Sequence, residues 1–333
     1  MLYVTTRSKF DTYTVHRANQ SDRGPDGGLY LPFRLPKLEK AEVLALCEQP
    51  FSNRIAQIVN LFFGTQLTGW DVELCGGKSP VRLVPMSHRI VVAEAWHSHD
   101  LDLSRFAERL SARICNYGDA MRPVTSWMGI AVRIAVLFAT YAQLLTTDAA
   151  RFESPIDIAV AAEDFAAPMA VWYAREMGLP VANIVCSHDN SSVWDLIHHG
   201  EVRTEIGMPE NLERLIFATL GVEENLRYCE ICESGKLYAT KPGMLEQLRK
   251  GMYAAVVSTD RVEALIPSVY RACGYILGPG TASAYGGLQD YRARSGENRL
   301  ALLLSEKSPA LDGEQVADGL GMSVQQLQEQ LGE

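Results

Sequence analysis

The sequence predicts an α/β protein built on a parallel sheet, and two observations carry this prediction. Residues 158–162 and 181–186 are short, largely apolar runs, which are typical of strands buried on both faces of a sheet. A segment with helical character at about 168–177 lies between them and ends at Gly178 and Pro180. This strand–helix–strand order is the usual connection between two parallel strands.

The remaining elements are predicted from apolar spacing and from turn residues. In order, they are a strand at 2–6, a turn at 25–28, a strand at 29–31, helices within 38–64, two strands within 81–92, a helix at 124–147, helices at 211–221 and 244–252, strands at 254–258, 275–277 and 301–304, and two short helices after Ser308. The last helix is expected to begin at Ser323, because Gln326 three residues later completes a capping box.

The composition is that of an ordinary globular protein of 333 residues, with 47% hydrophobic and 21% charged residues. A net charge of −9 argues against binding to a nucleic-acid backbone, and no polybasic run favours an anionic membrane. The longest apolar run, at 130–145, is interrupted by polar residues and is too short to predict a membrane span. Seven scattered cysteines and an N-terminus without a secretory pattern favour reduced thiols and a cytoplasmic location.

Several short motifs resemble those of threonine synthases and occur in the same order. They are Pro-Asp-Gly-Gly-Leu-Tyr-Leu-Pro at 25–32, a signature segment at 94–107, Met-Gly-Leu-Pro at 177–180, Asn-Leu-Glu-Arg-Leu-Ile-Phe at 211–217 and Leu-Gly-Pro-Gly-Thr-Ala at 277–282. The resemblance implies the tryptophan-synthase-β-like fold, which is fold-type II of the enzymes that use pyridoxal phosphate (PLP).

The signature segment lacks the residue that gives this family its chemistry. In threonine synthases a lysine of this segment binds PLP as an imine; the matching residue here is Ser104, and Arg105 replaces the acidic residue that follows. A serine hydroxyl cannot form an imine with an aldehyde. No lysine occurs between Lys78 and Lys236. The resemblance therefore implies that the covalent anchor is lost, and no catalytic residue is expected.

A second departure falls on the loop that binds the cofactor phosphate. The family's Gly-Asn-Phe-Gly-Asn corresponds to Glu163, Asp164, Phe165, Ala166 and Ala167, followed by a proline. The glycines that leave backbone N–H groups accessible to a phosphate are lost, and two carboxylates are gained. One unit-charge repulsion at about 4 Å costs about 4 kcal/mol at an effective dielectric of about 20. No cofactor is therefore expected unless the carboxylates turn outward.

Two further departures remove other parts of the family's site. Only residues 108–126 separate the signature from the next motif, which is too short for the small subdomain that the family inserts here. The family's Asn-Trp-Ala-Arg is replaced at 126–129, so Gly129 takes the arginine position and an anion contact is expected to be absent.

The division expected from these comparisons has four regions. They are an N-terminal region of strands and helices at 1–93, a truncated remnant of the small cofactor subdomain at 94–126, an α/β core at 127–307 and a helical tail at 308–333.

Seven residues are expected to surround a remnant cleft: His97, His99, Arg105, Glu163, Asp164, His188 and Thr281. The resemblance implies that Thr281 lies near the position of the cofactor's pyridine nitrogen. No metal site is expected, because His97 and His99 supply the spacing of only two ligands and Cys229-Glu-Ile-Cys232 supplies half of a zinc site.

These features predict a threonine-synthase-like pseudoenzyme without PLP. Its expected role is to bind a small polar or amino-acid-like ligand in the remnant cleft, or to pair with another protein. That partner is either an intact threonine synthase, which this chain would regulate, or a second copy of this chain in a homo-oligomer. The alternative is an active enzyme. It would be a PLP-dependent lyase that uses a distant lysine such as Lys236 or Lys241, or a metal- or thiol-dependent enzyme built from His97, His99 and Cys186.

Overall fold

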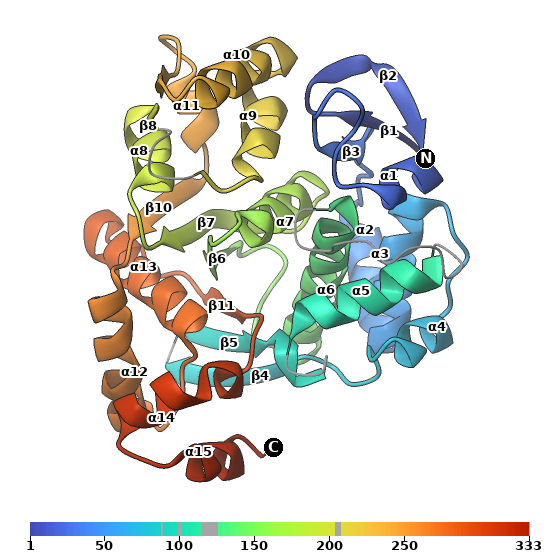
Figure 1. Ribbon diagram of the computed structural model, residues 1–333. Helices are drawn as coiled ribbons and strands as arrows, with labels where there is room; N and C mark the ends of the chain where they lie inside the picture. The colour runs from blue at the N-terminus through green and yellow to red at the C-terminus, as the bar shows by residue number, and fades with distance from the viewer. Residues whose placement is uncertain (88, 99–101, 115–125, 204–207, 333) are drawn as a thin grey trace.

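The centre of the molecule is a six-stranded, mostly parallel sheet (Figure 1). A computed structural model describes all residues except 88, 99–101, 115–125, 204–207 and 333. The strand order is β10-β7-β6-β11-β5-β4, and only the edge strand β4 runs antiparallel to its neighbour. The strands are β4 (Arg82–Ser87), β5 (Ile90–Glu94), β6 (Ile156–Ala161), β7 (Val181–His188), β10 (Met252–Val256) and β11 (Ala301–Ser305).

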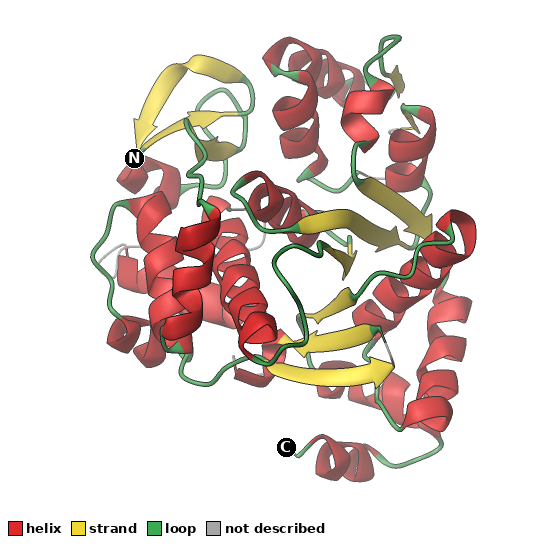
Figure 2. Cartoon of the chain, turned by 180° about the vertical axis from the view of Figure 1, so that it is seen from behind, coloured by secondary structure: helices red, strands yellow, loops and turns green. Residues whose placement is uncertain are grey.

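Helices cover both faces of this sheet, as Figure 2 shows from behind. On one face α13 (Pro279–Ser295) packs against the strands, and α12 (Thr259–Cys273) packs against α13. On the other face α7 (Ala166–Glu176) packs against β6 and β7, and α6 (Trp127–Thr146) lies between α7 and α3 (Phe51–Phe63).

Alternate residues of β6 contribute to separate apolar clusters. Ile158 and Val160 belong to the cluster that contains α6 and α7, whereas Ala159 belongs to the cluster that contains α13. This alternation is the period of two that a strand imposes on its side chains. The prediction of an α/β fold with strands buried on both faces is confirmed.

Helix α6 contains the apolar run at 130–145. With 20 residues it is long and apolar enough to cross a membrane by length and composition alone. In the structure 89% of its most apolar window is buried inside the protein, between α3 and α7. Its apolar surface on all sides is therefore explained by burial in the core.

The N-terminal region contributes a small antiparallel sheet and a group of helices. The sheet has the order β2-β1-β3, formed by β1 (Leu2–Thr5), β2 (Ser8–Thr14) and β3 (Tyr30–Pro32). The helices are α1 (Val15–Gln20), α2 (Lys40–Ala45), the 3-10 turn η1 (Leu46–Glu48), α3 and α4 (Gly69–Leu74).

The expected boundary after residue 93 falls inside β5. Because β5 pairs with β11 of the core, β4 and β5 belong to the central sheet. The next region contains the 3-10 turn η2 (Ala95–Ser98) and α5 (Leu103–Ile114); residues 115–125 lie outside the described part of the chain.

A helical lobe and a C-terminal tail complete the chain. The lobe contains α8 (Ser192–His199), β8 (Glu201–Arg203), α9 (Leu212–Leu220), α10 (Val222–Glu233), β9 (Leu237–Ala239) and α11 (Leu245–Arg249). The tail contains η4 (Pro309–Asp312), α14 (Gly313–Leu320) and α15 (Val324–Leu331). Ser323 and Gln326 form the expected capping box.

The predicted strand at 275–277 is not formed. This segment is an irregular connection between α12 and α13, and its side chains are buried in the cluster on the α13 side of the sheet. The apolar run that predicted a strand is therefore explained by burial of a short segment that does not pair with a strand.

Candidate functional site

A cavity of about 560 Å³ opens at the carboxyl ends of β6 and β11, where open α/β sheets commonly bind ligands. It lies among the first turns of α5, α7 and α13, the side of α6, and the segment that follows β11. The lining residues are Asp102, Ser104, Glu108, Arg133, Val160, Ala161, Glu163, Asp164, Ala167, Gly278, Pro279, Gly280, Thr281, Leu304, Glu306, Lys307, Leu311 and Asp312.

Ser104 lines this cavity at the start of α5. Its backbone N–H donates to Asp102 Oδ1 at 2.8 Å, so a carboxylate closes the first turn of the helix. The position at which the resemblance to threonine synthases implies a lysine therefore belongs to the cavity and carries a hydroxyl.

The start of α7 is closed in the same way. Asp164 Oδ1 accepts a hydrogen bond from the N–H of Ala166 at 2.8 Å. The intervening Phe165 is fully buried and has a φ of 62°, in the left-handed region. Pro168, in the first turn, has no N–H to offer. A helix start that could receive an external anion instead binds the carboxylate of its own loop.

Arg133 provides a guanidinium group that the sequence interpretation missed. It lies one turn beyond Gly129 on α6, and its Nη1 donates to the carbonyl of Gly129 at 3.2 Å. The cavity therefore contains a guanidinium, although Gly129 stands at the position where the family resemblance places one. However, Glu306 binds this side chain with two oxygens, at 2.8 Å from Nε and 3.0 Å from Nη2. Burial alone would lower the pKa of Arg133, but Glu306 and Asp164 outweigh it and raise that pKa.

Lys307 places an amine at the rim of the cavity. Its Nζ lies 3.2 Å from Glu163 Oε2, and both side chains are more than half exposed. Burial acts to lower the pKa of Lys307, but Glu163, together with Asp102 and Glu306, outweighs this effect and raises that pKa. The amine is therefore a protonated ammonium at neutral pH and a poor nucleophile.

Acidic groups dominate the described lining of the cavity. Six carboxylates face two cationic side chains, and each cation already contacts a carboxylate. The acidic residues are Asp102, Glu108, Glu163, Asp164, Glu306 and Asp312. This charge distribution favours a ligand with positive charge and disfavours an anion.

Thr281 also lines the cavity, but its hydroxyl is already engaged. It is buried at the start of α13 and donates to Ser305 Oγ at 2.8 Å. Ser305 Oγ also accepts from Trp96 Nε1 at 3.2 Å. These contacts fix the position of the hydroxyl.

The seven residues predicted for the cleft are only partly brought together. Glu163, Asp164 and Thr281 line it, whereas the described lining does not include His97, Arg105 or His188. His97 is exposed on η2 beside the ring of Trp96, and Arg105 is exposed because it follows Ser104 by one position on a helix. His188 ends β7 with its Nδ1 2.7 Å from Asp189. His99 lies outside the described residues.

The residues proposed for an alternative enzyme lie elsewhere. Lys241 contacts Glu224 at 3.2 Å in the helical lobe, and Lys236 lies between α10 and β9. Cys186 is fully buried on β7, where burial raises the pKa of its thiol to about 12. Among the described residues, no cluster of three or more His, Cys, Asp or Glu side chains could hold a metal ion.

The whole described fold is similar to solved threonine synthases. The similarity to the PLP-bound enzyme from Brucella melitensis has a TM-score of 0.82 with 18% identity, and covers 97% of this chain and 92% of that one. The yeast enzyme gives a TM-score of 0.77 with 14% identity over 96% and 90% of the two chains. The fold is therefore that of the fold-type II PLP enzymes.

The sequence comparisons match parts of this chain. Residues 2–78 match the family described as "Threonine synthase N terminus". The proteins named threonine synthase-like 1 from Homo sapiens and Mus musculus are 26% and 27% identical over 186 residues, which is 50% of this chain and 25% of each relative. This chain is therefore similar to threonine synthases in its fold and in parts of its sequence, and it matches about a quarter of the length of these curated relatives.

Proposed function

We propose that this protein is a non-catalytic member of its family that does not use PLP and that binds a small, positively charged polar ligand, such as an amine or an amino acid, in the acidic cleft. The observation that carries the proposal is the closed start of α7, where Asp164 accepts the N–H of Ala166. An incoming phosphate would have to displace this carboxylate and then remain beside it.

The other groups in the cleft support the same conclusion. The residue at the family's lysine position is Ser104, and the ammonium of Lys307 is held by Glu163. An aldehyde cofactor needs an unprotonated amine, and its phosphate needs free N–H groups or an unpaired cation. Arg133 does not supply that cation, because Glu306 binds it with both oxygens. The residues of this cleft do not fit PLP.

The charge of the cleft supports a ligand with at least one ammonium group. Asp102 and Asp164 use one oxygen each to close a helix start, which leaves their other oxygens for a ligand. An alkyl diamine or the ammonium end of an amino acid could donate to such oxygens. The alternative of a thiol enzyme has less support, because Cys186 is buried and its pKa is raised.

The first test is titration of the purified protein with PLP, followed by borohydride reduction and peptide mass spectrometry. We expect no imine absorbance and no modified lysine in the native protein. A reduced adduct at Lys307, or at any other lysine with stoichiometric yield, contradicts the proposal.

Two variants separate the effect of the missing lysine on PLP binding from the effect of the closed helix start at α7. Ser104→Lys alone should form little imine, because Asp164 still closes α7. Adding Asp164→Asn keeps an oxygen that can accept the N–H of Ala166 but removes its charge, and should raise PLP affinity at least tenfold, since about 1.4 kcal/mol corresponds to a factor of ten. Calorimetry with 1,4-diaminobutane, with inorganic phosphate as the anionic control, tests the sign of the ligand charge.

A further inference from the structure

Asn211 directly precedes α9, but its side chain does not cap that helix. An asparagine at this position commonly accepts a hydrogen bond from the first turn, and here no such bond forms. The fully buried side chain instead donates from Nδ2 to the backbone oxygen of Asp164 at 3.1 Å, and the backbone N of Asn211 donates to the same oxygen at 3.3 Å. The residue therefore holds the loop that closes α7.

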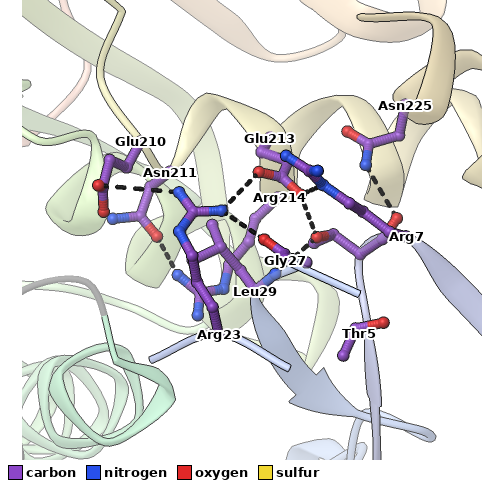
Figure 3. A network of polar contacts seen from close by, with 12 residues as sticks. Thr5, Arg7, Arg23, Gly27, Leu29, Glu210, Asn211, Glu213, Arg214 and Asn225 are labelled. Carbon is purple, nitrogen blue, oxygen red and sulfur yellow. Dashed lines mark hydrogen bonds and ion pairs between the residues drawn. The ribbon is translucent and has the colours of Figure 1, made fainter. Parts of the chain in front are cut away.

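The next residues connect the same turn to the N-terminal sheet (Figure 3). Arg214 is fully buried; it donates to Asn211 Oδ1, and its Nη2 donates to the carbonyl oxygen of Tyr30 in β3 at 2.9 Å. Glu213 accepts from Thr6, from Arg7 at 3.4 Å and from Arg23 at 3.2 Å. The start of α9 thus contacts both the N-terminal sheet and the cleft loop.

The cleft loop needs an external support. Phe165 has a left-handed φ, which is unfavourable for a residue with a Cβ atom and persists only where surrounding contacts enforce it. On the side of α9, Asn211 supplies two donors to the residue before Phe165. Losing one donor should let Asp164 release the N–H of Ala166 more often.

We infer that Asn211 is a positioning residue, which transmits the packing of the N-terminal sheet through Arg214 and Glu213 to the acidic loop of the cleft. The inference goes beyond the proposed function and rests on it only where ligand affinity is concerned. None of the residues 211–217 belongs to the described lining of the cleft, so the motif at these positions supports the loop from outside it.

The test compares Asn211→Asp with Asn225→Asp by hydrogen exchange. Asn225 is a matched control, because it is equally buried in the same network and donates to the carbonyl of Thr6 at 2.8 Å, on the side of the network away from the cleft loop. Asn211→Asp places an oxygen opposite the carbonyl of Asp164. We expect exchange at residues 163–167 to accelerate at least tenfold in Asn211→Asp and less than twofold in Asn225→Asp.

Equal acceleration of the loop in both variants, or none in Asn211→Asp, would overturn the inference. If Asn211→Asp does not fold, Asn211→Ala removes the side-chain donor without adding a charge and is measured in its place. Affinity for 1,4-diaminobutane is measured as well, and should fall at least threefold with Asn211→Asp only. If native protein does not bind this probe, the ligand proposal fails, while the exchange measurement still decides the role of Asn211.

Discussion

The cleft is acidic because each of its two cationic side chains is paired with a carboxylate of the same cleft. Arg133 and Lys307 could each attract an anion, but Glu306 and Glu163 contact them. The two contacts differ in strength: the Arg133 pair is nearly buried, whereas the Lys307 pair is largely exposed and should contribute no more than about 1 kcal/mol. Lys307 is therefore the cation that a ligand could release most easily.

Cys186 provides a residue-scale prediction that tests the thiol alternative. Because burial raises the pKa of this thiol to about 12, the native protein should contain almost no Cys186 thiolate at pH 8. Cys273, which is exposed on α12, should react at an ordinary rate. Alkylation with iodoacetamide followed by peptide mapping should modify Cys273 while Cys186 stays unmodified. Rapid modification of Cys186 in folded protein would favour a thiol enzyme.

The sequence could predict some residues of the cleft but not others. Ser104, Glu163 and Asp164 were found because they occupy positions of recognisable motifs. Arg133 was missed because the comparison placed the arginine at Gly129. Residue 133 lies one helical turn further along α6 and on the same face of the helix, and a position-by-position comparison does not detect this. Lys307 was missed because it reaches the cleft through the pairing of residue 307 with Asp102, a contact between distant segments.

At the scale of elements, the cleft is shaped by three helices that begin beside it. At the start of α5 the carboxylate of Asp102 accepts from the N–H of Ser104, and at the start of α7 the carboxylate of Asp164 accepts from the N–H of Ala166. Helix α13 begins at Gly278 and Pro279, without a side-chain cap. Two of the three positive helix ends are thus already satisfied by the protein, which is the structural reason for the low expected affinity for anions.

Asp71 provides the element-scale prediction, because it joins two helices. It completes a capping box with Thr68 at the start of α4, and its Oδ1 lies 2.6 Å from Arg113 Nη2 on α5. The backbone N–H of Thr68, together with Arg113, lowers the pKa of Asp71 to about 2. Since its usual value is near 4, this carboxylate stabilises the fold fully above about pH 4 and loses that contribution as the pH falls toward 2.

The measurement is urea unfolding of native protein and Asp71→Asn between pH 2 and 6. We expect Asp71→Asn to be less stable by about 1–2 kcal/mol at pH 6, and the difference to shrink as the pH approaches 2. A difference that does not depend on pH would show that the charge of Asp71 has no part in the effect.

Element prediction worked best where packing follows a simple period. The buried strands at 158–162 and 181–186 were found because strands covered on both faces are almost wholly apolar. Helix α13 was not predicted, since its two adjacent glycines are unusual inside a helix. Its packing against the sheet explains them: a Cβ at Gly287 would lie 3.1 Å from Ser187 Cβ, and one at Gly286 would lie 3.0 Å from Val257 and Leu265 side chains.

At the scale of the whole molecule, the N-terminal region is tied to the core in two ways. Strands β4 and β5 lie inside the central sheet, so the chain cannot be divided after residue 93. The small N-terminal sheet, by contrast, reaches the helical lobe through the polar contacts of Glu213 and Arg214 (Figure 3). These contacts link residues about 200 positions apart, a distance at which neither local propensity nor hydrophobic period carries information.

The last prediction concerns Glu213, which should decide how firmly the N-terminal sheet is held. Glu213 is 5% exposed and accepts from Thr6, Arg7 and Arg23. Removing one partner of a fully buried charge pair costs about 3–5 kcal/mol, and we expect somewhat less for Glu213→Ala, about 2–3 kcal/mol, because both arginines can turn toward solvent. Urea unfolding gives this value, and hydrogen exchange should show that residues 1–32 open before the central sheet.

Glu210→Gln is the matched control: Glu210 lies 3.7 Å from the same Arg23 but is half exposed, so its loss should cost less than about 0.5 kcal/mol. A Glu213→Ala protein as stable as this control, or one in which residues 1–32 and the central sheet still open together, would show that apolar packing, and not the polar junction, holds the N-terminal sheet in place.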